Sequence, residues 1–482
     1  MSQDEMAAVT ALNKFTNFSE WFDSLLLEAR IVDDRFPVKG FSVYLENGTF
    51  MLRRLRELLE SELNLTGHVE MQFPLVTTEE LFSREAQHIK GFSGEVFVIE
   101  SAGGGQLEKR LIIRPTSETI MYPMFKLWIR SHADLPLLVY QSNNVYRHET
   151  KATRPLLRVR EIPWNEAHTV HASASEAEEQ VLKAVEIYGR VLDRVGIGYL
   201  ILRRPDFDKF AGAKYSIAFD AWTPDGRVNQ VGTVHNLGRN FSRVFEIEFE
   251  TKNGRRENPY QLCYGFGYSR VMAAIIAQHG DDRGCVLPPE VASKQVVVVP
   301  IYFKGQEETI IAYARRVGES LKPLRVMVDQ RPDVTPGEKF YYWERLGVPV
   351  RVEVGPREVT ESKATVCRRD TLEREMVDFD DLPEHISDLL KKIDASLATR
   401  AKRMMEQMIV DIHDVSEGRE AISDRKILRV EWCGRIECAE QLKNSVGGEV
   451  RGTRFDVTEI PRGGCIICNQ QAREVVYVAR AY

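Results

Sequence analysis

A continuous apolar run at residues 294–302, KQVVVVPIY, separates two kinds of sequence pattern. After it, short apolar runs alternate with helical segments, the order typical of βαβ units around a mostly parallel sheet. Before it, β-rich runs follow one another with few helices between them, which is typical of an α+β domain on an antiparallel sheet. One hydrophobic core rarely serves 482 residues, so we expect separate domains.

We predict three domains from these patterns. Residues 1–289 form the α+β domain and residues 290–399 a small α/β domain. A long amphipathic helix, from Leu382 to about His413, leads into a third unit at 400–482, which holds four of the seven cysteines. No run approaches the ~20 apolar residues that cross a bilayer, so no membrane partner is expected.

Composition narrows the class of protein further. Charged residues make up 28% and hydrophobic residues 43% of the chain, which excludes a collagen-like, coiled-coil or mostly disordered protein. The start, MSQDEMAAVT, lacks the layout of a secretory signal, and an odd cysteine count fits a reducing compartment, so we expect a cytoplasmic protein. The net charge of −6 means that any nucleic acid must meet local basic patches.

Local patterns predict several elements of the first domain. We expect a helix within the first 30 residues and a second one, capped by Asn47 or Thr49, whose leucine stripe ends before Gly67. The alternation FEIEFE at residues 245–250 predicts a half-buried strand.

Two cysteine pairs stand in the third unit. Four residues separate Cys433 from Cys438, two separate Cys465 from Cys468, and 26 lie between the pairs. This arrangement suits a closed tetrahedral zinc site, whose role would be structural because it has no open position for a substrate. The alternatives are buried cysteines or a redox CxxC. The other three cysteines, Cys263, Cys285 and Cys367, stand in apolar contexts and are expected in the core.

Four segments of the first domain carry groups suited to chemistry. In RPTSE, Thr116 and Glu118 are suited to receive an ammonium group, although such a pair is often a helix cap. In RHE, Arg147 precedes a basic loop with Arg158; a guanidinium suits phosphate, and the alternative is an ion pair with Glu149.

The third and fourth segments lie on predicted strands. In WNEAH, Trp164, Glu166 and His168 alternate and therefore face one side of their strand; an exposed polar face is the alternative. GFGYSR places two glycines before Arg270, which suits a flat base and a phosphate tail, or only a tight turn. It lacks the third glycine and the βαβ context of a dinucleotide fingerprint.

Taken together and in this order, the segments resemble a class II aminoacyl-tRNA synthetase, in detail a prolyl-tRNA synthetase of the archaeal/eukaryotic type. The match extends over essentially the whole chain and includes RPTSETIMYP, W-x-E-x-H, GTVHNLG at 232–238, VLPPEVA and PGEKF. The resemblance implies a class II catalytic domain, an α/β anticodon-binding domain and a C-terminal zinc-binding domain. It also implies ATP-dependent ligation of L-proline to tRNA(Pro) through prolyl-adenylate, with Mg²⁺ as a cofactor.

The resemblance also assigns roles to residues. It implies that proline is held by Thr116, Glu118, Arg147, Trp164, Glu166, His168 and His235. It implies that ATP and Mg²⁺ are held by Arg147, Glu149, Arg158, Gln230, Thr233, Gly265, Gly267 and Arg270. The resemblance makes Arg147 and Arg270 the expected catalytic residues: Arg147 would bridge the proline carboxylate and the α-phosphate, and Arg270 would hold the γ-phosphate.

Further expectations concern partners and accuracy. The helix before Pro74 resembles the family's dimer element, so a homodimer is expected. Candidate tRNA phosphate contacts in the α/β domain are Arg315, Arg316, Arg325, Arg368 and Arg369. The alternative, favoured for any one of them taken singly, is an ordinary solvated charge on the surface. A small apolar pocket discriminates by only about 1–3 kcal/mol per methylene, so misactivation of alanine or cysteine is expected. The rivals are another class II synthetase and a non-catalytic paralogue, and the second should lack Arg147, Glu149 or Arg270.

Overall fold

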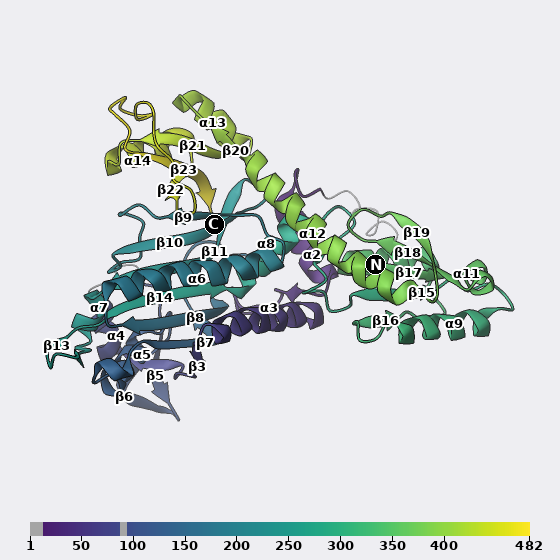
Figure 1. Cartoon of the computed structure of the whole chain (residues 1–482), viewed down its shortest axis with the longest axis horizontal. Helices are drawn as coiled ribbons and strands as arrows, with labels where there is room; N and C mark the ends of the chain where they lie inside the picture. Colours follow the sequence, from purple (N-terminus) through teal and green to yellow (C-terminus); the bar gives the residue numbers. More distant parts are fainter. Residues whose placement is uncertain (1–12, 87–93) are drawn as a thin grey trace.

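The structure is a computed structural model that describes residues 13–86 and 94–482. Its main feature is a sheet of eleven strands in the order β20-β21-β23-β22-β9-β10-β11-β14-β8-β7-β3 (Figure 1). The strands from the first domain are β3 (Val69–Glu70), β7 (Leu137–Tyr146), β8 (Glu161–His171), β9 (Tyr199–Arg203), β10 (Tyr215–Trp222), β11 (Arg227–Gly238) and β14 (Tyr260–Gly267). From β9 to β7 all neighbours are antiparallel, as predicted for this domain.

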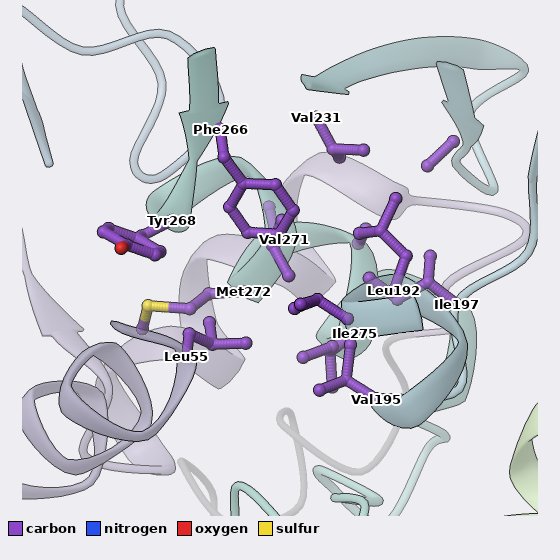
Figure 2. Packing of buried hydrophobic residues seen from close by; sticks show 14 of the residues in the cluster. Leu55, Leu192, Val195, Ile197, Val231, Phe266, Tyr268, Val271, Met272 and Ile275 are labelled. Carbon is purple, nitrogen blue, oxygen red and sulfur yellow. The ribbon is translucent and has the colours of Figure 1, made fainter. Parts of the chain in front are cut away.

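Helices cover one face of this sheet, and the other face carries the site. The covering helices are α3 (Glu46–Leu65), α6 (Ala174–Arg194) and α8 (Tyr268–His279). Figure 2 shows their apolar side chains meeting Phe266 of β14 and Val231 of β11. Because side chains alternate along a strand, the neighbours of Phe266 point to the opposite face.

Smaller elements frame the catalytic sheet. A three-stranded sheet, in the order β4-β6-β5, packs near helices α4 and α5. The bounds of the remaining elements of this domain are α2 (Phe18–Glu28), β1 (Val32–Asp33), β2 (Val43–Tyr44), β4 (Val76–Thr78), α4 (Glu79–Ala86), β5 (Phe97–Ala102), β6 (Gly105–Ile113), α5 (Glu118–Trp128), η1 (His132–Asp134), α7 (Asn240–Val244), β12 (Phe249–Glu250) and β13 (Arg256–Glu257).

Two local predictions in this domain were wrong. The second helix begins at Glu46, so Asn47 and Thr49 lie inside its first turn, and the Asn47 amide donates to the carbonyl of Ala29 instead. Of the segment 245–250, only its last two residues form a strand, β12, because α7 and a turn occupy the residues before it. Apolar–acidic alternation was therefore a weak guide over so short a segment.

The α/β domain contains a five-stranded sheet in the order β16-β15-β17-β18-β19. Only β16, β15 and β17 are parallel, and β18 and β19 add antiparallel, so the sheet is mixed rather than mostly parallel. The elements are β15 (Val296–Pro300), α9 (Glu307–Ser320), β16 (Val326–Val328), α10 (Pro336–Leu346), β17 (Val350–Val354), α11 (Pro356–Glu361), β18 (Lys363–Arg368) and β19 (Arg374–Asp378).

Helix α12 (Leu382–Met408) joins this domain to the C-terminal unit, as Figure 1 shows. The elements of that unit are β20 (Ile409–Asp411), α13 (Val415–Ser423), β21 (Ile427–Trp432), α14 (Ile436–Val446), β22 (Glu449–Arg454) and β23 (Glu474–Ala481). Strand β22 pairs with β9, and β23 pairs with β11, so the unit extends the catalytic sheet. Within residues 13–86 and 94–482, no helix is long and apolar enough to cross a membrane.

Candidate functional site

A cavity of about 280 Å³ opens on the uncovered face of the catalytic sheet. It brings together residues from all four sequence segments. Twelve of the fourteen candidate residues for proline and ATP line it: Thr116, Glu118, Arg147, Trp164, Glu166, His168, Gln230, Thr233, His235, Gly265, Gly267 and Arg270. The register explains this convergence, because β8, β14 and β11 lie side by side, with Glu166 opposite Gly265 and Gly265 opposite Thr233.

The segment RPTSE is more than a helix cap. Helix α5 begins at Glu118, yet Ser117 at its N-cap donates its hydroxyl proton to Glu166. The Thr116 hydroxyl donates to Glu118 Oε2 at 2.5 Å, and both residues are buried. An acidic, hydrogen-bonded pair therefore faces the cavity, which suits a cationic amine.

Glu166 is the centre of a buried hydrogen-bond network. In addition to Ser117, its carboxylate accepts from Gln141 Nε2 at 2.8 Å and lies 3.3 Å from His168 Nε2. His168 Nδ1 in turn lies 3.1 Å from the Tyr122 hydroxyl. Burial alone would raise the pKa of Glu166, but these bonds outweigh it and lower the pKa, so the carboxylate is ionised at neutral pH.

Two arginines line the cavity, one from the end of β7 and one from the start of α8. Arg147, just after β7, donates from Nε to the carbonyl of Pro115 at 3.0 Å and lies over the Trp164 ring. Arg270, in the first turn of α8, donates to the carbonyl of Gln230 at 3.1 Å. Burial lowers the pKa of both, that of Arg270 to about 10. Both guanidiniums therefore keep their charge at neutral pH and attract anions.

The two remaining candidates, Glu149 and Arg158, line a second, smaller cavity of about 80 Å³. Arg147 and Arg270 line both cavities, so the two spaces adjoin. Glu149 Oε2 lies 3.7 Å from Arg158 Nε. The carboxylate that was considered as a partner for Arg147 is therefore paired with Arg158.

His235 and Gln230 extend from β11 into the main cavity. His235 Nδ1 lies 2.7 Å from the Ser216 hydroxyl, and its ring lies tilted against Phe210, with 4.8 Å between the centroids. Burial, with help from the charge of Arg204, lowers the pKa of His235 to about 3. The ring is therefore neutral at pH 7 and contributes shape and hydrogen bonds rather than charge.

The two glycines of GFGYSR differ in their surroundings. A Cβ on Gly265 would come within 3.1 Å of the Trp164 ring, a tight contact that the indole could relieve only by moving a few tenths of an ångström away from the sheet. A Cβ on Gly267 would meet only the side chain of Arg270, at 3.6 Å or more. Gly267 is therefore not required by packing and leaves space above the strand.

Several residues that line the cavity were not anticipated. They include Arg204, Asp208, Lys209, Phe210, Ser216 and Cys263. Cys263, which we expected in the core, is only 5% exposed but faces the cavity, because it lies two residues before Gly265 on the same strand. That alternation could have identified it from sequence. The others come from the loop after β9 and from β10, where no sequence pattern marks a site.

The four C-terminal cysteines gather at one point. Their sulfur atoms all lie within 4.8 Å of one another, and Cys433 Sγ and Cys468 Sγ are 3.8 Å apart. A tetrahedral zinc ion with bonds of about 2.3 Å places its sulfurs about 3.8 Å apart. The donor set therefore fits zinc, and its four thiolates would fill every position around the ion.

A third cavity, of about 500 Å³, lies in the α/β domain between α10 and the sheet. Phe340 forms part of its wall, and the guanidinium of Arg351 lies 4.0 Å from the centre of that ring. Arg374 lies near the same ring at 5.8 Å, and Glu344 accepts from Arg351 at 2.7 Å. Arg351 is buried and also donates to Glu353 at 3.0 Å, so its guanidinium lies over the ring and is already paired.

The arginines proposed from sequence as phosphate contacts have different surroundings. Arg369 is buried and donates to both oxygens of Asp281, at 2.8 and 2.6 Å. Arg325 donates to main-chain carbonyls at residues 289 and 292. These two residues therefore tie the domains together. Arg315 and Arg316 are exposed, whereas the side chain of Arg368 is only 17% exposed and pairs with Asp370.

Comparison with known proteins defines the class first. The tRNA synthetase class II core domain (G, H, P, S and T) matches residues 98–279, and an anticodon binding domain matches residues 295–389. The C-terminal domain of prolyl-tRNA synthetase matches residues 415–482. The protein is thus a class II aminoacyl-tRNA synthetase.

Individual relatives define the family. The chain is 47% identical over 468 residues to a proline–tRNA ligase of Methanopyrus kandleri, covering 96% of each chain, and 44% identical to that of Thermococcus kodakarensis, covering 97% of this chain and 98% of the other. A Giardia lamblia prolyl-tRNA synthetase in complex with prolyl-adenylate superimposes with a TM-score of 0.95, at 34% identity, over 98% of this chain and all of the other. The chain belongs to the prolyl-tRNA synthetase family and is an enzyme, a proline–tRNA ligase.

Proposed function

We propose that the main cavity joins L-proline to ATP, releasing pyrophosphate, and that the resulting prolyl-adenylate is attacked by the 3′-terminal hydroxyl of tRNA(Pro). One observation carries this proposal: the cavity unites an acidic pair, an aromatic wall and two charged guanidiniums. These groups suit the amine, the ring and the two anions that must meet. The alternatives are a different amino acid in the same site and a non-catalytic tRNA-binding protein.

On the proline side, Thr116 and Glu118 receive the imino group, because their oxygens form a buried acidic pair. Trp164 walls the ring, and the Glu166–His168 network fixes the shape of the pocket floor. The neutral ring of His235 closes the pocket. Shape alone discriminates weakly in such a pocket, so we propose that alanine and cysteine are misactivated at a low level.

On the ATP side, Arg147 bridges the proline carboxylate and the α-phosphate, and Arg270 holds the γ-phosphate. Thr233 and Gln230 contact ATP or its Mg²⁺, and the adenine lies over Gly265 and Gly267. Glu149 and Arg158, in the adjoining cavity, contact the base and the outer phosphate.

The reaction needs positioning more than acid–base catalysis. The proline carboxylate is already ionised at neutral pH, so it needs no general base to attack the α-phosphorus. Two anions must instead be held together, and charge that spreads over the phosphate oxygens must be stabilised. Fixed guanidiniums do both, and Mg²⁺ bound to the phosphates would supply further positive charge.

We also propose that the α/β domain binds the anticodon of tRNA(Pro). The cavity beside Phe340 would accept a base at the aromatic ring, with the exposed side chain of Arg374 near its phosphates. Its aromatic and basic character supports this role, as does the match of residues 295–389 to an anticodon binding domain.

Four further parts of the proposal concern assembly. We propose domains at residues 1–289, 290–399 and 400–482, a structural zinc ion on the four cysteines, and a cytoplasmic location. We also propose a homodimer formed around β3, an edge strand with exposed apolar neighbours. Leu65 and Leu75 flank the strand in sequence, and Val69 lies on the strand itself; all three side chains are exposed. Sedimentation of the full chain tests the dimer.

The deciding experiment is ATP–pyrophosphate exchange with each of the twenty amino acids, with Mg²⁺ and without tRNA. Strong exchange with proline, and weak exchange with alanine or cysteine, is expected. Exchange led by another amino acid would leave the class intact and refute the proline assignment. A complete lack of exchange in protein that binds tRNA would favour the non-catalytic alternative.

A further inference from the structure

A buried charge cluster joins the C-terminal unit to the wall of the catalytic cavity. It consists of Arg204 after β9, Asp220 on β10 and Arg451 on β22, whose side chains are 3%, 0% and 8% exposed. Arg204 donates to both oxygens of Asp220, at 3.0 and 2.7 Å, and Arg451 donates from Nε to the same carboxylate at 2.9 Å. Arg204 also donates to the main-chain carbonyl of Arg451 at 2.7 Å.

Arg204, which this cluster holds in place, also hydrogen-bonds the side chain of Gln230. Its Nη2 donates to Gln230 Oε1 at 2.7 Å. A guanidinium has only donors, so the oxygen of the Gln230 amide must face it, and the amide nitrogen remains to donate to a ligand. The main-chain carbonyl of Gln230 accepts from Arg270 at 3.1 Å. A continuous series of contacts therefore runs from Arg451 to the guanidinium at the start of α8.

The backbone of β22 allows the contact between Arg451 and Arg204. Gly452, next to Arg451, has a φ of +129°, and a Cβ there would lie 2.1 Å from the carbonyl oxygen of Arg203. Only glycine lets β22 approach β9 so closely. The close approach brings the carbonyl of Arg451 within reach of Arg204.

We propose that Arg451 is a positioning residue for the ATP half of the site, so that the C-terminal unit completes the catalytic cavity. This inference rests on the proposed function, in which Gln230 and Arg270 contact ATP. The carboxylate of Asp220 is shared by the guanidiniums of Arg204 and Arg451. When the guanidinium of Arg451 is removed, the carboxylate loses one of its two donors and can reorient together with Arg204. Arg204 then loosens its hold on Gln230, whereas Glu166 is held by Ser117, Gln141 and His168, none of which belongs to this cluster.

The test compares R451M with R454M in the full chain, by proline-dependent pyrophosphate exchange. Arg454 lies on the same strand, pairs with Asp456 and is partly exposed, so it controls for changes in β22. We expect R451M to raise the KM for ATP by about tenfold or more and to change the KM for proline by less than about threefold. R454M should behave as wild type.

Two further variants make the test decisive. If Arg451 acts through Gln230, the double variant R451M/Q230A should have the same KM for ATP as Q230A alone. R451K keeps the positive charge but not the planar guanidinium, so its affinity for ATP should lie between those of R451M and the wild type. If R451M does not fold, R451K takes its place in the test. An unchanged KM for ATP, or equal losses for ATP and proline, would overturn the inference. Wild-type protein without proline-dependent exchange would instead refute the proposed function.

Discussion

Replacing Glu166 by alanine removes the acceptor of three buried donors. Ser117, Gln141 and His168 all direct a donor at this carboxylate, and the half-buried Asn143 amide adds a longer bond at 3.4 Å. A buried donor without a partner costs about 1–3 kcal/mol, and breaking a buried charged network typically costs about 3–5 kcal/mol in total. We therefore expect E166A to lower the free energy of unfolding of the catalytic domain by about 3–5 kcal/mol.

Glutamine at the same position should cost much less, about 1–2 kcal/mol. Its carbonyl oxygen can accept from Ser117 and Gln141, and its amide can donate to His168 if that ring takes the other tautomer. The tautomer is available because His168 Nδ1 faces the Tyr122 hydroxyl, which accepts as well as donates.

Thermal unfolding of the full chain measures the difference, at roughly 2–4 °C per kcal/mol for a domain of this size. Glu161 provides the matched control, since it lies on the same strand and accepts from Asn144 and Tyr146 but is only half-buried. E161A should shift the melting temperature by no more than about 2–4 °C. If E166A proves no more destabilising than E166Q, the carboxylate does not anchor the network and the reasoning is wrong.

Four other outcomes are expected. R147A should lower proline-dependent pyrophosphate exchange by at least about 10²–10³-fold, with an unchanged circular dichroism spectrum, because one fixed donor to a reacting anion is lost; wild-type rates would contradict the assignment. C433S should lose zinc by metal analysis and speed hydrogen exchange in residues 415–482, and wild-type protein without zinc would refute that site. In urea unfolding, G452A should destabilise the C-terminal unit by about 2–5 kcal/mol, because the added Cβ would clash with the carbonyl oxygen of Arg203. G447A is the control: Gly447 also has a positive φ but no such clash, so it should cost only about 1 kcal/mol. Equal costs for the two variants would show that β22 does not approach β9 so closely. Burial raises the pKa of Asp220, but the guanidiniums of Arg204 and Arg451 lower it more, so the pKa lies below the usual 3.8. The ionised carboxylate should therefore stabilise the fold fully above about pH 5, and this contribution should be lost as the pH falls below about 4. A D220N variant that loses stability just as steeply in acid would contradict this.

Much of the site was predictable because its residues stand in short local patterns. Alternation placed Trp164, Glu166 and His168 on one face of a strand, and the structure has them lining one cavity. The spacing of the cysteine pairs likewise suited a four-sulfur cluster, and the four sulfurs do gather. Each of these inferences needs only the geometry of one strand or turn, which a few neighbouring residues determine.

Other features depend on contacts between residues far apart in the chain. The short strand at residues 249–250 and the mixed sheet of the α/β domain departed from prediction, since pairing depends on neighbouring strands more than on the pattern within one. The hydroxyl of Ser117 bonds Glu166 instead of capping its own helix. No local signal marks that choice.

The sequence by itself determined the class of the chain, the antiparallel character of its first domain and most residues of the cavity, since periodicity and motif spacing are local properties. Only the tertiary structure decided how these parts cooperate. It joined the C-terminal strands to the catalytic sheet and buried Arg204, Asp220 and Arg451 together, although the last two lie 231 positions apart. Such a cluster forms because buried charges need partners, and folding alone determines which partners come within reach.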